Sequence, residues 1–153
     1  MPNITPLAFD TYQAVVRNAV GSHMFRTLYA DVSGVKTDIA ENGNLSCAFF
    51  VSSVLTMLGM AKAVHATVSG TVADLMGSGW IAAEAPEAGD VIVWETVDFG
   101  TGSPHGHIGF YVGDGRAVSN DFKAGSPAEH EWTFGGTRKV EMILRNPAVR
   151  PNM

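Results

Sequence analysis

The sequence contains one side chain suited to nucleophilic attack, the thiol of Cys47, which is its only cysteine. Cys47 follows Asn44 and Ser46, whose side chains can cap a helix, and precedes the apolar run 48–51. A thiol in the first turn of a helix lies close to unpaired N–H groups and to the positive end of the helix dipole, which favour the thiolate. We therefore expect Cys47 to be a nucleophile with a pKa below that of free cysteine. The alternative is a buried cysteine that serves only packing.

A general base for this thiol is available about sixty residues later, where His107 begins an apolar segment that ends in the turn signal Asp114-Gly115. The alternatives are a core histidine or a histidine at the end of a strand. His105 and His107 flank a glycine and could together bind a metal ion, but no Cys, Asp or Glu stands at a spacing that obviously completes a site. We expect neither a metal nor another cofactor.

The residue that orients the imidazole can be predicted from strand register. If Asp114 and Gly115 form a two-residue hairpin loop, Gly109 pairs with Asn120, so Asn120 shares the face of His107. The sequence therefore predicts Asn120 as the orienting residue, unless it is only a turn residue at the end of the strand. A three-residue loop would instead bring Ser119 and Asp121 to that face, and Asp121 is the second choice.

Hydrophobic periodicity predicts helices first and strands second. Helical patterns cover residues 10–20, 46–58 and 71–76, and the middle segment is apolar on nearly every side, as in a buried helix. Short β-branched or aromatic segments follow at 91–94, 108–112, 117–120 and 139–144, whereas residues 25–43 have no clear pattern. The expected fold is α+β, formed by a single domain over residues 1–153.

Composition narrows the possible partners and locations. Ten Lys and Arg against fifteen Asp and Glu give a net charge of −5, and the absence of a basic cluster argues against nucleic acid. No apolar segment reaches membrane-spanning length, and the N-terminus lacks the pattern of an export signal. A lone cysteine forms no intrachain disulfide and suits a reducing compartment, so we expect a cytoplasmic protein. The sequence carries no signal for an oligomeric state.

Three segments in order resemble the NlpC/P60 family of papain-like cysteine peptidases and, more distantly, the CHAP amidases. The segment 46–51 with Leu58-Gly59 is similar to the nucleophile helix of the family, 86–94 to its Pro-x-x-Gly-Asp strand, and 107–115 to its histidine strand and hairpin. The match covers residues 44–121. The resemblance implies a papain-like α+β fold with the nucleophile helix packed on an antiparallel sheet. It also implies cleavage of amide bonds in peptides, especially those of bacterial peptidoglycan.

The chain departs from this family at several positions. The family usually has Asp before the nucleophile and Ser-Gly after it. This chain has Ser46 before Cys47 and Ala48-Phe49 after it. Its third catalytic position falls at Ser119, and a serine cannot easily replace the usual His, Asn or Gln. The upstream tyrosine of the family has only a distant candidate in Tyr29, while the aromatic segment 129–136 could line a substrate groove. Two alternatives follow, an acyltransferase with the same Cys and His, and a binding module without catalysis.

Overall fold

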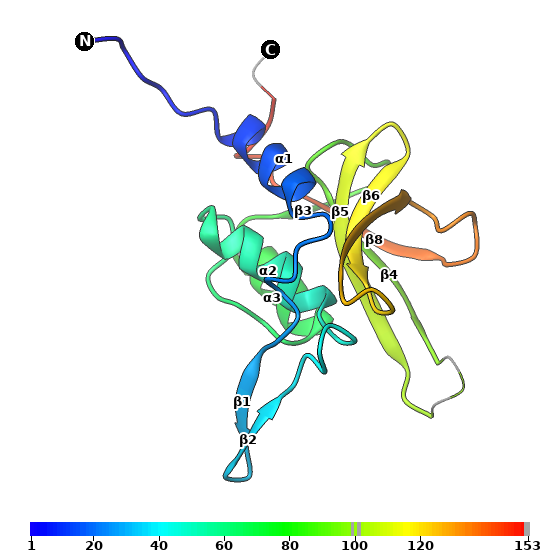
Figure 1. Cartoon of the computed structure of the whole chain (residues 1–153). Helices are drawn as coiled ribbons and strands as arrows, with labels where there is room; N and C mark the ends of the chain where they lie inside the picture. The colour runs from blue at the N-terminus through cyan, green and yellow to red at the C-terminus, as the bar shows by residue number, and fades with distance from the viewer. Residues whose placement is uncertain (99, 101, 152–153) are drawn as a thin grey trace.

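A computed structural model describes residues 1–98, 100 and 102–151, and it contains helices on one side of a sheet (Figure 1). The helices are α1 (Ala8–Asn18), α2 (Cys47–Met57) and α3 (Val68–Gly77). The strands are β1 (Tyr29–Val32), β2 (Val35–Asp38), β3 (Ile81–Ala83), β4 (Val91–Val97), β5 (His105–Gly113), β6 (Arg116–Asp121), β7 (Ser126–Glu131) and β8 (Val140–Arg145). The α+β class predicted from the sequence is confirmed.

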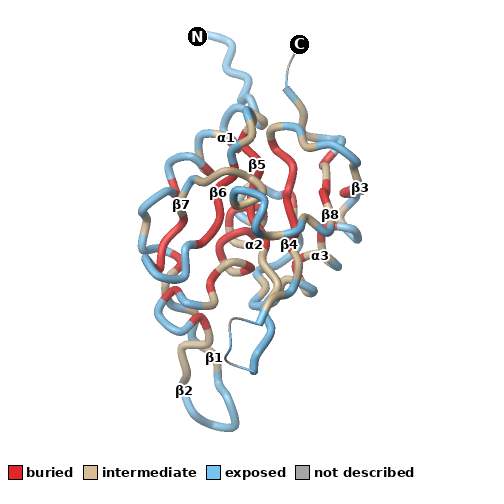
Figure 2. The backbone as a smooth tube through the Cα atoms, turned by 90° about the vertical axis from the view of Figure 1, so that its right-hand side faces the viewer, coloured by how far each residue is buried: buried red, intermediate tan, exposed pale blue. Residues whose placement is uncertain are grey.

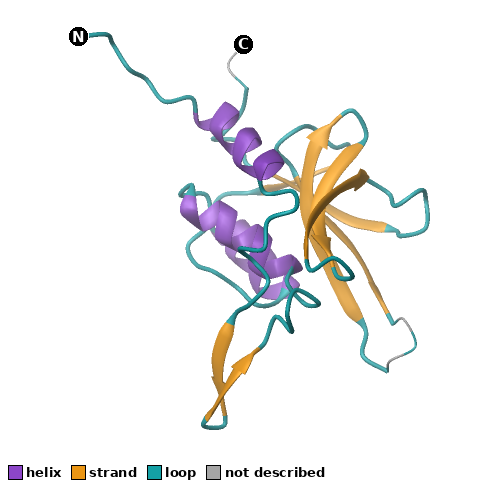
Figure 3. Cartoon of the chain, viewed as in Figure 1, coloured by secondary structure: helices purple, strands orange, loops and turns teal. Residues whose placement is uncertain are grey.

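Six strands form one antiparallel sheet in the order β3-β8-β4-β5-β6-β7. The helices occupy a separate layer on one face of this sheet, as Figure 3 shows. Strands β1 and β2 pair only with each other and project away from both layers (Figures 1 and 3). The expectation that residues 25–43 are irregular is therefore wrong. Most side chains of this hairpin are exposed, so its strands lack the apolar alternation that would have identified them.

Helix α2 is the centre of the main core. Phe50, Val51 and Leu55 are completely buried, and the ring of Phe50 packs edge to face on Phe110 of β5, with ring centroids 5.2 Å apart. Figure 2 shows that buried residues follow α2 and the middle strands, whereas the β1–β2 hairpin is mostly exposed or half-buried. Because α2 is apolar on nearly every side, burial between the sheet and the other helices fixes it, as predicted. Within the part of the chain that is described, no helix is both long and apolar enough to cross a membrane.

Two strands of the six-stranded sheet were not predicted from the sequence either. Strand β7 contains Pro127 and three charged or ionisable residues, a composition that suits an edge strand, and β7 does lie at an edge of the sheet. Strand β3 has only three residues and pairs with β8 at the opposite edge. Neither strand carries an alternating apolar pattern, because neither has to bury a full face.

The Gly89-Asp90 pair that precedes β4 has a structural role. The carboxylate of Asp90 is completely buried and accepts two hydrogen bonds from the guanidinium of Arg145, at 2.9 and 2.7 Å. The hydroxyl of Tyr12 donates to the carbonyl of Gly89 at 2.9 Å. These contacts join the start of β4 to β8 and to α1. The buried aspartate before this strand is therefore explained by its structural contacts alone.

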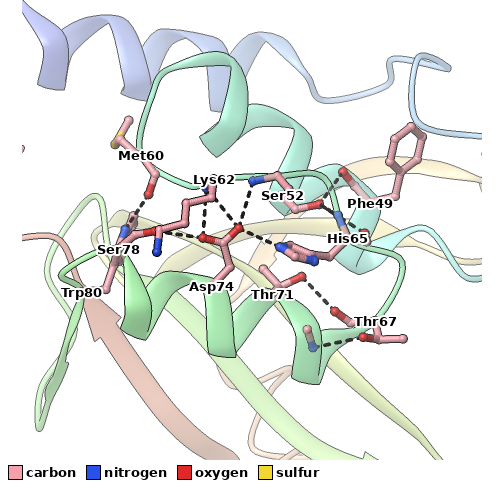
Figure 4. Close-up of polar contacts among 12 residues, drawn as sticks. Phe49, Ser52, Met60, Lys62, His65, Thr67, Thr71, Asp74, Ser78 and Trp80 are labelled. Atoms are coloured by element: carbon pink, nitrogen blue, oxygen red, sulfur yellow. Dashed lines mark hydrogen bonds and ion pairs between the residues drawn. The ribbon is translucent and has the colours of Figure 1, made fainter.

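A carboxylate on α3 holds the connection between α2 and α3. Asp74 accepts hydrogen bonds from the backbone N–H groups of Lys62 and Ala63, from the hydroxyl of Ser78 and from the ring of His65, the last at 2.7 Å (Figure 4). Burial opposes the charge of Asp74, but these hydrogen bonds outweigh it and hold the pKa of the carboxyl well below its usual range. The network fixes α3 beside α2.

This network predicts a pH-dependent stability. Asp74→Asn should lower the free energy of unfolding by about 2 kcal/mol at pH 7, since several hydrogen bonds to a charged acceptor are weakened together. Because the folded-state pKa is depressed, the contribution is present above the unfolded pKa of about 4 and is lost as the pH falls below it. Urea unfolding of both proteins between pH 7 and pH 3 measures the difference.

The exposed residue Glu84 provides the control, and Glu84→Gln should leave stability nearly unchanged at every pH. A difference between wild type and Asp74→Asn that stays constant down to pH 3 would show that the charge of Asp74 is not what stabilises the connection.

Candidate functional site

The first turn of α2 lies against the backbone of β5, next to His107. The sulfur of Cys47 donates to the carbonyl oxygen of Gly106 at 4.0 Å, and the backbone N–H of Ile108 points to the same sulfur. These two residues flank His107. The pairing of β5 with β6 ends at Gly109 and Ser119, so the backbone of β5 before Gly109 is open to the thiol. Cys47 and His107 therefore line one cavity.

The register of β5 and β6 differs from the predicted one by a single residue. Gly113 pairs with Arg116 as expected, and Asp114 and Gly115 both have positive φ, as a tight hairpin turn requires. A bulge between Tyr111 and Gly113 then shifts the remaining pairs, so that Gly109 lies opposite Ser119 instead of Asn120. The predicted assignment of faces is wrong for this reason.

The close approach of the two strands depends on Gly109. A Cβ atom at this position would lie 2.7 Å from the Cβ of Ser119 and 2.8 Å from the carbonyl oxygen of Val118. Any larger residue would push β6 away. Glycine therefore allows the side chain of Ser119 to come next to His107.

The imidazole of His107 belongs to a chain of hydrogen bonds across three strands. Its Nε2 lies 2.9 Å from Oγ of Ser119, and the same Oγ lies 2.7 Å from Nε2 of His130 on β7. Nδ1 of His130 lies 2.7 Å from the carbonyl oxygen of Glu131. From the sequence, Ser119 was only the third choice for the orienting residue, after Asn120 and Asp121, and His130 was not proposed for this role. No sequence signal could have placed His130 here, because it lies in the edge strand β7, which the sequence pattern does not predict.

Asn120, the predicted orienting residue, lines the same cavity as His107, but its amide is hydrogen-bonded elsewhere. Its amide nitrogen donates to the carbonyl oxygen of Gly43 at 2.7 Å, and its Oδ1 is buried without a hydrogen-bond partner among the described residues. Asn120 thereby ties β6 to the loop that leads into α2. Asp121 is exposed and accepts from the backbone N–H groups of Lys123 and Ala124 in the following turn. Both residues therefore stabilise loops.

The expected capping of α2 and the expected thiol pKa are both contradicted. The N-cap residue is Ser46, but its side chain makes no capping hydrogen bond. Burial raises the pKa of the Cys47 thiol, although the N–H groups of Ile108, Ala48 and Cys47 itself oppose the shift. Burial lowers the pKa of His107 to about 3, helped by the positive charge of Arg138 and, where the pH is low enough to protonate it, by that of His130. At neutral pH the two groups are therefore a thiol and a neutral imidazole.

Arg138 is a charged residue of the site that the sequence did not reveal. Its guanidinium donates to the carbonyl oxygen of Glu95 at 3.1 and 3.0 Å and to that of His105 at 2.9 Å, and it lines the cavity. Its positive charge favours the thiolate of Cys47 and disfavours the imidazolium of His107. No sequence motif surrounds Arg138, which precedes β8.

The cavity that holds these groups has a volume of about 1500 Å³. Its lining includes the apolar side chains of Val68 and Val72 of α3 and Met142 of β8, and it also includes His130 and Phe134, whose rings stack on each other. The segment 129–136 therefore contributes to the cavity through Glu129, His130 and Phe134. Tyr29, in contrast, is exposed on the β1–β2 hairpin and is not among the described lining residues.

The pair His105 and His107 does not form a metal site in the described part of the chain. No three His, Cys, Asp or Glu side chains within it are close enough together to hold a metal ion. His105 is exposed, and the ring of His107 is engaged by Ser119.

The electrostatics of Cys47 predict its alkylation profile. The rate of reaction with iodoacetamide should rise with pH and have its midpoint above about 8.5, the pKa of a free cysteine thiol, because burial raises the pKa of Cys47. Arg138→Gln should move the midpoint further up, since a cation that favours the thiolate is lost. The pH dependence of the alkylation rate, followed by mass spectrometry, measures both.

Lys139→Gln is the matched control, since it removes one positive charge from the neighbouring position, and it should leave the midpoint unchanged. A wild-type midpoint below 8 would mean that the thiol is already activated in the resting protein and would contradict this description of the site.

No protein-family model matches the chain, and no curated protein matches its sequence.

Proposed function

We propose that the protein is a cysteine hydrolase that cleaves amide bonds, with Cys47 as nucleophile and His107 as general base and acid. One observation carries the proposal. A cysteine in the first turn of a buried helix lines the same cavity as a histidine whose Nε2 is hydrogen-bonded away from it, to Ser119. This leaves Nδ1 as the ring nitrogen available to the thiol, which is the division of roles that a nucleophile and base pair requires.

The reaction follows from the protonation states. The sulfur of Cys47 attacks the amide carbonyl while its proton moves to Nδ1 of His107, forming a tetrahedral oxyanion and an imidazolium. The backbone N–H of Cys47 at the start of α2 donates to the oxyanion. The C–N bond then breaks, the amine leaves with the proton of the imidazolium, and a thioester remains. Water, deprotonated by His107, hydrolyses the thioester and restores the thiol.

A thiol and a neutral imidazole are suitable starting states for this reaction. The proton transfer produces opposite charges on two groups that line the same cavity, and Arg138 favours the anionic sulfur as it forms. Before attack, the thiol must leave the carbonyl oxygen of Gly106, to which it donates in the resting structure. Burial keeps the thiol unreactive until a substrate is bound.

The resemblance to the NlpC/P60 family supports peptide amides, and peptidoglycan peptides in particular, as the substrate class. The family has its third catalytic residue at the position of Ser119, whose hydroxyl here forms a hydrogen bond with Nε2 of His107. Under this proposal the fold is the papain-like arrangement of that family, with α2 as the nucleophile helix. The residues that differ from the family, Ser46, Ala48 and Phe49, are buried or half-buried, and Ala48 packs in the main core.

Purified peptidoglycan fragments are the direct test. Incubation with the protein, followed by mass spectrometry, should give two products whose masses sum to the substrate plus one water. Cys47→Ala and His107→Ala should each abolish product formation while the proteins stay folded. Products that form equally with Cys47→Ala would contradict the proposal, and so would wild-type protein that leaves every fragment and a library of short peptides intact.

The third position gives a separate prediction. Ser119→Ala should lower kcat by about one to three orders of magnitude, because His107 loses the partner that orients its ring. Asn120→Ala should have a smaller effect on kcat and should mainly lower the Tm, because its amide ties the Gly43 loop to β6. Kinetics and thermal unfolding of both variants distinguish the roles. A silent Ser119→Ala with a severe loss of kcat in Asn120→Ala would restore Asn120 as the orienting residue.

A further inference from the structure

We propose that His130 is a positioning residue, which acts through Ser119 to hold His107 in the tautomer that has its proton on Nε2 and its lone pair on Nδ1. The significance of this tautomer for catalysis depends on the proposed function, but the tautomer itself does not. Three consecutive hydrogen bonds connect the backbone carbonyl of Glu131 to the ring of His107 through His130 and Ser119.

The first hydrogen bond fixes the protons of His130. A carbonyl oxygen only accepts, so Nδ1 of His130 must donate to the carbonyl of Glu131, 2.7 Å away. Burial lowers the pKa of His130, which keeps the ring neutral at pH 7. A neutral imidazole carries one N–H, and therefore Nε2 of His130 is an acceptor.

The next two hydrogen bonds transmit this assignment. Ser119 has one hydroxyl hydrogen, which it must donate to the lone pair on Nε2 of His130, 2.7 Å away. Oγ of Ser119 then has only acceptor capacity left for the ring of His107, 2.9 Å away. Nε2 of His107 must therefore carry the proton. Because burial also keeps His107 neutral, its Nδ1 has the lone pair that a general base uses.

The opposite order of protons is costly. If Ser119 donated to His107, Nε2 of His130 would have to carry the proton, and its Nδ1 would face the carbonyl of Glu131 with two lone pairs opposed. Leaving a buried acceptor unsatisfied in this way costs about 1–3 kcal/mol. Ser119 alone has no such preference, since a hydroxyl donates and accepts equally well.

The surrounding aromatic side chains hold His130 in place. Its ring stacks on Phe134 with centroids 4.0 Å apart and an interplanar angle of 14°, and Trp94 lies beside both His130 and His107. His130 therefore has two separable properties, a planar ring that packs and a nitrogen that accepts. A serine at the third position can orient His107 because the acceptor that directs it lies on the next strand.

Two variants separate these properties. His130→Phe keeps a flat ring against Phe134 but removes the acceptor, whereas His130→Gln loses the ring but can place its amide oxygen near the former Nε2. His23→Phe is the matched control, because His23 is exposed and is not among the described lining residues of the cavity. The readouts are the imidazole tautomers, from long-range ¹H–¹⁵N NMR correlations of histidine-labelled protein, and kcat with the fragment that is cleaved.

In the wild type and in His130→Gln we expect His107 to carry its proton on Nε2. In His130→Phe the Nδ1–H form should become populated, and kcat should fall by about tenfold or more while His130→Gln retains most of its activity. A wild-type His107 protonated on Nδ1 would overturn the inference, whether or not any variant folds. Full activity and an unchanged tautomer in His130→Phe, with loss in His130→Gln, would also overturn it, since only packing would then matter.

The two hypotheses fail in different ways. If the protein cleaves no amide bond, kcat is not measurable, but the tautomer of His107 still tests the role of His130. If amides are cleaved and the tautomer does not depend on His130, the proposed function stands and the positioning role is wrong.

Discussion

The contact between the first turn of α2 and the backbone of β5 determines the site. β5 and β6 stop pairing at Gly109 and Ser119. Beyond this point the thiol of Cys47 contacts the backbone of β5, at the carbonyl of Gly106 and the N–H of Ile108. This contact needs a helix that is buried deeply enough to keep its N-terminus fixed. The apolar side chains of α2, among them Phe50 against Phe110, provide that constraint. The core therefore positions the nucleophile directly.

Burial has a second consequence, because it sets the charge of both Cys47 and His107. The pKa of Cys47 is raised and that of His107 is lowered, so the pair is neutral at rest. In such a site, orientation of the imidazole matters more than its charge, since only one of its two nitrogens can accept the thiol proton. The hydrogen-bonded chain through Ser119 to His130 supplies this orientation. Arg138 contributes a positive charge that favours the thiolate of Cys47.

The sequence was sufficient to predict the α+β class, the buried helix at Cys47 and the strand that begins near His107. These features depend on local patterns, namely apolar periodicity and glycine-rich turns, which a single sequence displays. The register of β5 and β6, from which Asn120 was predicted as the third residue, was predicted wrongly because a bulge between Tyr111 and Gly113 shifts it by one position. Nothing in the sequence distinguishes that bulge from a regular hairpin. His130 and Arg138 were missed because they come from an edge strand and a loop, which tertiary contacts alone bring to the cavity.

The central claim is that Cys47 attacks the substrate covalently, and a thioester on its sulfur is the most direct test. Cleavage of a peptide substrate can be quenched in acid within the first turnover, and the intact protein can be weighed by mass spectrometry. The account predicts an added mass equal to the acyl half of the substrate, located on Cys47 and absent from Cys47→Ala. Turnover without any adduct on Cys47, and unchanged in Cys47→Ala, would contradict it.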